Sequence, residues 1–257
     1  GKAATWLSLS TSARAPNLFE LFYTGDTGSF YQQAPDSLAL QSAKTVELGS
    51  KKRSGRLSYQ ASLFAMWVDE LLEEQLTLAR TQSSKPAVSL TNLDQGSFYG
   101  ADLGLEHQLT PSIVHGHQLG LVLAEVEDQG SVHASRRSAP LQGRHTLKQR
   151  WNKKWWGEAS MSWAAAVPGA ALAPLDRHDL RICAVEQQPW LASAQASVAC
   201  SGTPAWWTAG LRVVYNRKKD WRMGLRIDNL LDRKYRTHQS ATYAKGVTAR
   251  LDVEVAF

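Results

Sequence analysis

The strongest constraint on the fold is a strict two-residue alternation in the last eleven residues of the chain, 247–257. From Val247 to Phe257 every second side chain is apolar, and four of the five residues between them are polar or charged. This period predicts a β-strand with one apolar and one polar face. A strand of this kind that ends on an aromatic residue is typical of bacterial outer-membrane β-barrels, because their outside meets lipid and their inside meets water.

The same alternation recurs along the chain and predicts about ten antiparallel strands. We expect them near residues 4–12, 45–51, 57–67, 99–106, 119–123, 145–151, 159–165, 207–215, 221–227 and 247–257. Tight turns alternate with long polar segments, which lie near 13–44, 71–90, 127–140, 166–205 and 231–244. All tight turns therefore fall at one end of the sheet. This is the outer-membrane arrangement, with short turns in the periplasm and long loops outside the cell.

Composition agrees with an all-β membrane protein and excludes other classes. The chain has no run of ~18 apolar residues, which excludes transmembrane helices. It has ten tryptophans, and we expect Trp151, Trp155 and Trp156 to lie in an interfacial aromatic girdle. The pI near 9.4 is accompanied by no nucleic-acid-binding signature, so no nucleic-acid partner is expected. A soluble β-sandwich or propeller would not need charges along a whole inner face.

Three short motifs resemble the C-terminal half of TonB-dependent outer-membrane receptors, and they occur in that family's order. Residues 12–21, S-A-R-A-P-N-L-F-E-L, resemble the family's R-A-P-x-x-x-E-L signature. Residues 45–49 are similar to x-x-E-x-G, and residues 228–235 to N-L-x-D-x-x-Y. The positions that carry the resemblance are Arg14, Pro16, Glu20, Glu47, Gly49, Asn229, Asp232, Tyr235 and the terminal Phe257.

The resemblance implies a barrel of 22 strands with an N-terminal plug inside it. At about 25 residues for each strand and loop, such a barrel needs roughly 550 residues. We therefore expect residues 1–257 to be the C-terminal part of the barrel domain, without the plug and the first strands. Left open, its two strand edges would be unpaired in lipid, so we expect no function from this part alone.

The resemblance also implies the activity and the partners of the whole protein. It would import a scarce nutrient such as a ferric siderophore, with energy delivered by the TonB complex through the missing plug. No catalytic residue and no cofactor are expected, because no bond of the substrate changes. The other implied partners are outer-membrane lipid and the barrel assembly machinery, which would contact the C-terminal strand.

Charged and aromatic side chains of the long loops are the candidate ligand contacts, because they suit an anionic, aromatic-rich iron chelate. Ordinary loop or girdle roles are the alternative for each of them. The predicted contacts are Arg14, Tyr23, Asp26, Phe30 and Tyr31 in the first long loop, with Arg181 and Trp190 in the loop near 166–205. Haem is disfavoured, because residues 17–40 lack the His that haem receptors of the family carry there.

The motif and inner-face residues are expected to be structural. Pro16 fixes the chain where it leaves the first strand, Arg14 pairs with an acidic wall residue, and Asn229 hydrogen-bonds backbone at a strand end. The inner-face charges alternate in sign across neighbouring strands, so we expect them to form wall salt bridges. These charges are Arg212, Arg222, Arg226, Arg250, Asp228, Asp252 and Glu254.

Two residue pairs bear on metal and disulfide chemistry. His115 and His117 share one strand face, as a metal pair would, but the sequence shows no third ligand and no metal site is assigned. Three methionines and scattered histidines argue against a dedicated copper receptor. Cys183 and Cys200 lie in one polar segment on the outer side, so a loop-closing disulfide is predicted, with two free thiols as the alternative.

Two other classes of membrane barrel remain as alternatives. A complete small barrel enzyme, of the protease or phospholipase type, would need a Ser/His or Asp/His constellation at its rim. His238 and Ser240 lie two residues apart, but no supporting motif surrounds them. A passive pore or an adhesin is the second alternative. The enzyme class does not explain the motifs at 14–16 and 229–235.

Overall fold

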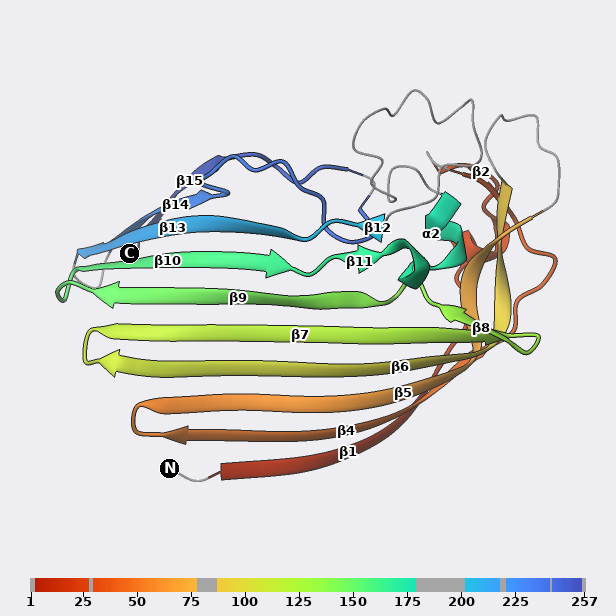
Figure 1. The fold of residues 1–257 in the computed structure, drawn as a ribbon, viewed down its shortest axis with the longest axis horizontal. Coiled ribbons are helices and arrows are strands. Elements are labelled where there is room, and N and C mark those ends of the chain that lie inside the picture. Colours follow the sequence, from red (N-terminus) through yellow and green to blue (C-terminus); the bar gives the residue numbers. More distant parts are fainter. Residues whose placement is uncertain are drawn as a thin grey trace.

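Ten long antiparallel strands form the wall of the molecule (Figure 1). The computed structural model describes residues 3–27, 30–77, 87–178, 202–217, 221–240 and 242–255. In sheet order the wall strands are β1 (Ala3–Arg14), β4 (Gln41–Ser54), β5 (Leu57–Leu76), β6 (Ala87–Thr110), β7 (Ile113–Asp128), β9 (Ala139–Arg150), β10 (Trp155–Ala164), β13 (Trp206–Arg217), β14 (Trp221–Asp228) and β15 (Thr248–Val255). The predicted number of strands and their antiparallel order are confirmed.

The two ends of the wall differ. The described tight turns that join wall strands lie at one end, called the turn end, and Gly55 adopts φ +53° in the first of them. Figure 1 shows the shorter elements at the opposite end, called the loop end. They are α1 (Leu18–Phe22), β2 (Gly25–Asp26), β3 (Tyr31–Gln33), β8 (Ser131–Ala134), β11 (Val167–Pro168), the 3₁₀ turn η1 (Gly169–Ala171), α2 (Pro174–His178) and β12 (Gly202–Thr203). Among the described residues, no helix is long and apolar enough to cross a membrane.

The two faces of the wall differ as the alternation predicted. Strand register places Leu48 beside Leu63 near one edge of the sheet and Leu225 beside Leu251 near the other. All four side chains belong to the outer face and are exposed, Leu63 by 59% and Leu251 by 62%. Their neighbours along each strand point to the opposite, inner face, where charged residues such as Arg226 lie. An apolar outer face and a polar inner face suit a wall between lipid and water.

Aromatic side chains form two rows on the outer face. On each of β5, β10 and β13, two of them lie eight residues apart in the sequence. These pairs are Tyr59 and Trp67, Trp155 and Trp163, and Trp207 and Tyr215. Register places Trp155 beside Tyr215 and Trp163 beside Trp207, so each row continues from strand to strand. Two such rows are the interfacial girdles of a membrane barrel.

Trp156 does not belong to the girdle, and that prediction was wrong. Adjacent residues of a strand point to opposite faces, so Trp156 faces inward while Trp155 faces outward. On the inner face the Lys148 Nζ lies 4.2 Å from the ring centroid of Trp156, and the Arg212 guanidinium lies 5.3 Å from it. The ring therefore contacts cations of the polar wall. Trp151, also predicted in the girdle, is 56% exposed just beyond the end of β9.

An apolar core closes the inner side of the wall near the loop end. It consists of Val68, Leu71, Leu93, Phe98, Ala124 and Val126. Here β5 and β6 run beyond the predicted strands at 57–67 and 99–106 and occupy much of the expected loop 71–90. Leu71 and Leu72 are both almost fully buried although they are adjacent in the strand. Protein covers both faces at this height, so the alternation that predicted the strands is lost.

We expect Gly100→Ala to destabilise the wall more than the matched change Gly104→Ala on the same strand face. A Cβ atom at Gly100 would lie 2.0 Å from the Phe64 ring, whereas at Gly104 the nearest atom is the Gln60 carbonyl oxygen at 3.9 Å. Displacing the ring costs about 1–3 kcal/mol. Urea unfolding in lipid vesicles, on the protein that carries this chain, measures both free energies. Equal losses at the two positions would contradict the packing described here.

Candidate functional site

The R-A-P segment forms a hook where β1 reaches the loop end. β1 ends at Arg14, and the side chain of Asn17 begins α1 by accepting from the Glu20 N–H at 2.9 Å. Glu20 returns the contact by accepting from the Asn17 N–H at 2.8 Å, which completes a capping box. The Arg14 guanidinium donates to the same carboxylate. Arg14 therefore pairs with an acid six residues away in its own motif, and not with an acidic residue of the wall as predicted.

Glu20 is the electrostatic centre of this hook. Partial burial alone would raise the pKa of its carboxyl group, but the hydrogen bonds from the Asn17 N–H and from Arg14 outweigh it and lower the pKa overall. The carboxylate is thus ionised at neutral pH, as both of its donors require. Pro16 sits inside the hook, between the end of β1 and the N-cap of α1.

The other ligand candidates of the first long loop lie in different surroundings. The Tyr23 hydroxyl donates to the Asp26 carbonyl oxygen at 3.2 Å, and its ring stacks on Phe19 with centroids 4.3 Å apart. Phe30 is only 5% exposed and packs with Val88 and Leu175, so it forms core and not a ligand-contact surface.

Tyr31 begins β3, which pairs in parallel with the start of β6. The candidates Arg181 and Trp190, both cysteines of the predicted disulfide and the terminal Phe257 lie outside the described residues.

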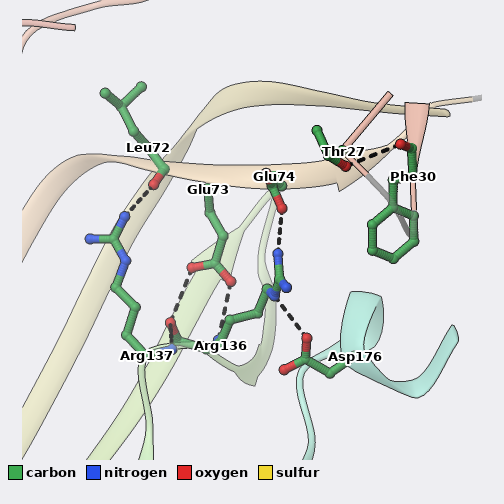
Figure 2. A network of polar contacts seen from close by, with 9 residues as sticks. Thr27, Phe30, Leu72, Glu73, Glu74, Arg136, Arg137 and Asp176 are labelled. Carbon is green, nitrogen blue, oxygen red and sulfur yellow. Dashed lines mark hydrogen bonds and ion pairs between the residues drawn. The ribbon is translucent and has the colours of Figure 1, made fainter. Parts of the chain in front are cut away.

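A polar network near the loop end joins three separate segments (Figure 2). Arg136, between β8 and β9, donates from Nε to Asp176 of α2 at 2.8 Å and from Nη1 to Glu74 of β5. The Ser135 hydroxyl donates to Glu73 at 3.0 Å, and the Arg136 N–H donates to the same carboxylate at 3.3 Å. The network therefore fastens one connecting loop and one short helix to the end of β5.

The charges of this network are deeply placed. Asp176 has a side chain only 1% exposed, and that of Arg136 is 26% exposed. Burial alone would lower the pKa of Arg136, but Asp176 and Glu74 raise it overall, so the guanidinium stays charged. Next to it, Arg137 donates to the Leu72 carbonyl oxygen at 2.6 Å. Sequence reasoning missed this network, because it joins residues about 40 and 60 positions apart.

On the inner face, three arginines form a row across the last three wall strands. Register places Arg212 beside Arg226 and Arg226 beside Arg250. Arg212 lies beside Glu158 of β10, whereas the carboxylate partners of Arg226 and Arg250 lie along their own strands. Arg226 donates to Asp228 at 2.8 Å, and Arg250 donates to Asp252 at 2.6 Å.

The predicted alternation of sign across these neighbouring strands is therefore wrong at this height. It holds nearer the turn end, where Arg222 lies beside Glu254. On β9 and β10, Arg144 also forms a cross-strand salt bridge to Glu158 at 3.5 Å. A polar hollow of ≈ 310 Å³ lies next to the arginine row and is lined by Arg144, Arg226, Asp228, Tyr235 and Lys245 among others.

The two remaining motifs shape the wall and its last loop. Glu47 accepts from the Trp6 indole at 3.3 Å, and Gly49 leaves room for that ring, since a Cβ there would lie 2.0 Å from it. Asn229 adopts φ +50° and donates to the Arg233 and Lys245 carbonyl oxygens at 2.8 and 3.2 Å.

Two further motif residues hold the ends of the same loop. Asp232 accepts from the Val247 N–H at 2.8 Å. The Tyr235 ring packs on Trp206, with centroids 4.5 Å apart. Together with Asn229, they bring the chain from β14 back to the start of β15.

Comparison with known proteins agrees with these motifs. Residues 3–230 match the family model described as TonB dependent receptor-like, beta-barrel. The chain belongs to the TonB-dependent receptor family. It is accordingly part of a bacterial outer-membrane protein, whose loop end faces the outside of the cell. No curated protein matches the sequence significantly.

Solved TonB-dependent receptors share the fold at low sequence identity. The copper transporter OprC is 17% identical with a TM-score of 0.75, and 99% of this chain covers 37% of that protein. A mutant of the ferric enterobactin receptor PfeA from Pseudomonas aeruginosa is 14% identical with a TM-score of 0.68, and the match covers 99% of this chain and 38% of that protein. The FrpB iron transporter from Neisseria meningitidis is 14% identical with a TM-score of 0.68, and the match covers 98% of this chain and 37% of that protein. This receptor chain thus spans little more than a third of their length.

We expect the hook of this receptor to open in acid. The folded-state pKa of Glu20 lies below its unfolded value, so its stabilisation is complete above the unfolded pKa. It is lost as the pH falls below the unfolded pKa and through the lower folded pKa. Hydrogen exchange of the Leu21 and Tyr23 amides, bonded to Asn17 and Phe19, reports the opening. A Glu20→Gln variant should abolish the pH dependence, and an unchanged profile would contradict the assignment.

We expect Arg136→Met to loosen the loop end of the receptor locally. The substitution removes the Arg136 cation from Asp176 and Glu74, and such a loss costs about 3–5 kcal/mol when the pair is fully buried and less at this partial exposure. Protease cleavage between β8 and β9 should accelerate at least tenfold. Lys44→Met is the control, because its salt bridge to Asp69 is exposed and worth under about 1 kcal/mol. Equal cleavage of both variants would refute the role of the network.

Proposed function

We propose that this chain is the C-terminal part of the barrel of a TonB-dependent importer whose cargo is an anionic metal chelate such as a ferric siderophore. The observation that carries the proposal is the arginine row formed by Arg212, Arg226 and Arg250 on the inner face. In the barrel this face borders the aqueous interior, through which the cargo passes.

The arginine row gives the interior wall a positive field. Side chains directly opposite each other on paired strands have Cβ atoms about 4.5–5.5 Å apart, so three like charges lie close together. Asp228, Asp252 and Glu158, which lies beside Arg212, neutralise them only in part, and the Arg250 side chain remains 76% exposed. A low-dielectric wall concentrates such a field in the space that it encloses. An anionic chelate is therefore attracted, and exposed contacts of this kind are weak enough to release it.

The remainder of the importer is part of the same proposal. The chain spans little more than a third of the solved receptors, and the two ends of its sheet, β1 and β15, pair only with β4 and β14 among the described residues. We propose that further barrel strands join both edges and that a plug, on which the TonB complex acts, fills the interior. The Arg-rich row then faces the plug or the cargo that moves past it.

The enzyme alternative receives no support from the geometry of its best candidate. His238 has its Nδ1 3.1 Å from the Thr203 hydroxyl, and burial lowers the pKa of its ring. The Ser240 hydroxyl instead donates to the Thr242 carbonyl oxygen at 2.8 Å. A nucleophile needs a base within hydrogen-bond reach, and these two side chains each bond elsewhere. We therefore propose transport without a chemical step.

Uptake of a radiolabelled ferric catecholate tests the proposal. Cells that lack their other siderophore receptors should take up the chelate when they produce the protein that carries this chain, and only with an intact TonB complex. The double change Arg226→Gln with Arg250→Gln should lower uptake about three- to tenfold, because the field that concentrates the anion is weakened. The double change Lys153→Gln with Lys154→Gln, in the turn between β9 and β10, is the charge-matched control. TonB-independent uptake, or an equal loss in the control, would exclude this function.

A further inference from the structure

Four of the seven histidines lie together on the outer face of β6, β7 and β9. Strand register places His107 beside His115 and His117 beside His145. The same face carries apolar side chains such as Leu147, which is paired with His115 and 46% exposed. The sequence identified only His115 and His117, which share β7. The third ligand, His145, comes from another strand and lies 28 residues from His117. The expectation of scattered histidines is thus wrong for this part of the wall.

Three of these imidazoles are in direct contact. The Nδ1 atoms of His117 and His145 are 2.7 Å apart, and His117 Nε2 lies 3.2 Å from His115 Nδ1. One nitrogen from each of the three rings lies within 4.8 Å of the others. The Trp163 indole closes the group by donating to His145 Nε2 at 3.1 Å.

The indole fixes the protonation of the whole group. Because an indole N–H only donates, His145 Nε2 accepts and its Nδ1 carries the proton. That proton points to His117 Nδ1, so His117 donates in turn from Nε2 to His115 Nδ1. All three rings are then neutral, and each keeps one lone pair. Neutral imidazoles with lone pairs are the form in which histidine binds metal ions.

We propose that His115, His117 and His145 form a binding site for a divalent transition-metal ion, such as Zn²⁺ or Cu²⁺, on the outer face of the barrel. Imidazole ligands suit these ions. Nitrogens that bind one zinc ion at 2.0–2.1 Å lie about 3.4 Å apart, and one nitrogen from each of the three rings lies within 4.8 Å of the other two. Because the 2.7 and 3.2 Å contacts use opposite nitrogens of His117 and each holds a proton, the rings must turn and change tautomer to direct three lone pairs at one ion. His107, beside His115 in the register, is the candidate fourth ligand.

The position of the site on the wall determines how ions reach the histidines and which strands a bound ion would link. His115 and His117 lie two and four residues from the start of β7, and His145 lies five residues from the end of β9. The site therefore spans ~7–17 Å of strand from the turn end, and ions reach it from the water at that end. Polar side chains on a lipid-facing wall are costly and mark functional positions by default. A bound ion would link β7 directly to β9 and thereby hold the wall together at this height.

Metal binding to the detergent-solubilised protein that carries this chain, stripped with EDTA, tests the proposal. We expect one Zn²⁺ per chain in competition with a chromogenic indicator, and a rise of the thermal unfolding midpoint on adding Zn²⁺. Cu²⁺ should give an electron paramagnetic resonance signal split by at least three nitrogens. His117→Gln and His145→Gln should each weaken binding at least tenfold and lose one nitrogen from that signal. His133→Gln, on β8, is the matched control and should bind as the wild type does.

Two further variants separate metal binding from a hydrogen-bonded chain that merely satisfies its own polar groups. His115→Gln removes the terminal ring and tests the site if the central variants fail to fold. Trp163→Phe removes the competing donor at His145 and should keep or strengthen binding. The proposal is overturned if the wild type binds no ion, or if His115→Gln and His133→Gln bind equally well. It is overturned likewise if Zn²⁺ raises the unfolding midpoint of no variant, the wild type included.

Discussion

A backbone N–H or C=O group within a bilayer has no water to bond, so a neighbouring strand must supply its partner. The wall of this receptor follows from that requirement. β1 and β4 pair without interruption from Ala3 with Lys52 to Arg14 with Gln41, and eight further strands continue the sheet. Because almost every wall residue is paired in a ladder, side-chain alternation and the loop end are what remain free to vary. The arginine row and the histidine cluster are positioned by side-chain alternation, and the hook and the polar network lie near the loop end.

The fold was accessible from the sequence wherever one face of a strand meets lipid and the other meets water. Leu225 and Leu251, with polar neighbours on either side, identify their strands without further information. The pattern failed where that asymmetry ends. Leu71 and Leu72 are both covered by protein, so the strand continued unseen beyond Trp67. Trp156 shows the complementary error, because an aromatic near a turn was assigned to the membrane interface without regard to its face.

The candidate site divides in the same way, according to the distance between partners in the sequence. The hook of Arg14 and Glu20 lies within six residues and was visible as a motif, although its internal pairing was not. Arg136 and Glu74 are 62 residues apart, and His117 and His145 are 28 apart. These contacts depend on the order and register of strands, which no local pattern contains. The family motifs therefore describe single turns and hooks, whereas charge networks and clusters across strands require the structure.

The two aromatic rows also fix a length. Eight residues of strand extend ~26 Å, and a strand tilt of ~40° reduces this to a height of ~20 Å between the rows. Typical hydrocarbon layers are about 30 Å thick, and the bacterial outer membrane is thinner than average. The spacing of Trp155 and Trp163 on β10 and of Tyr215 and Trp207 on β13 thus makes this receptor a poor fit for thick membranes. Hydrophobic mismatch alone would favour its residence in the outer membrane.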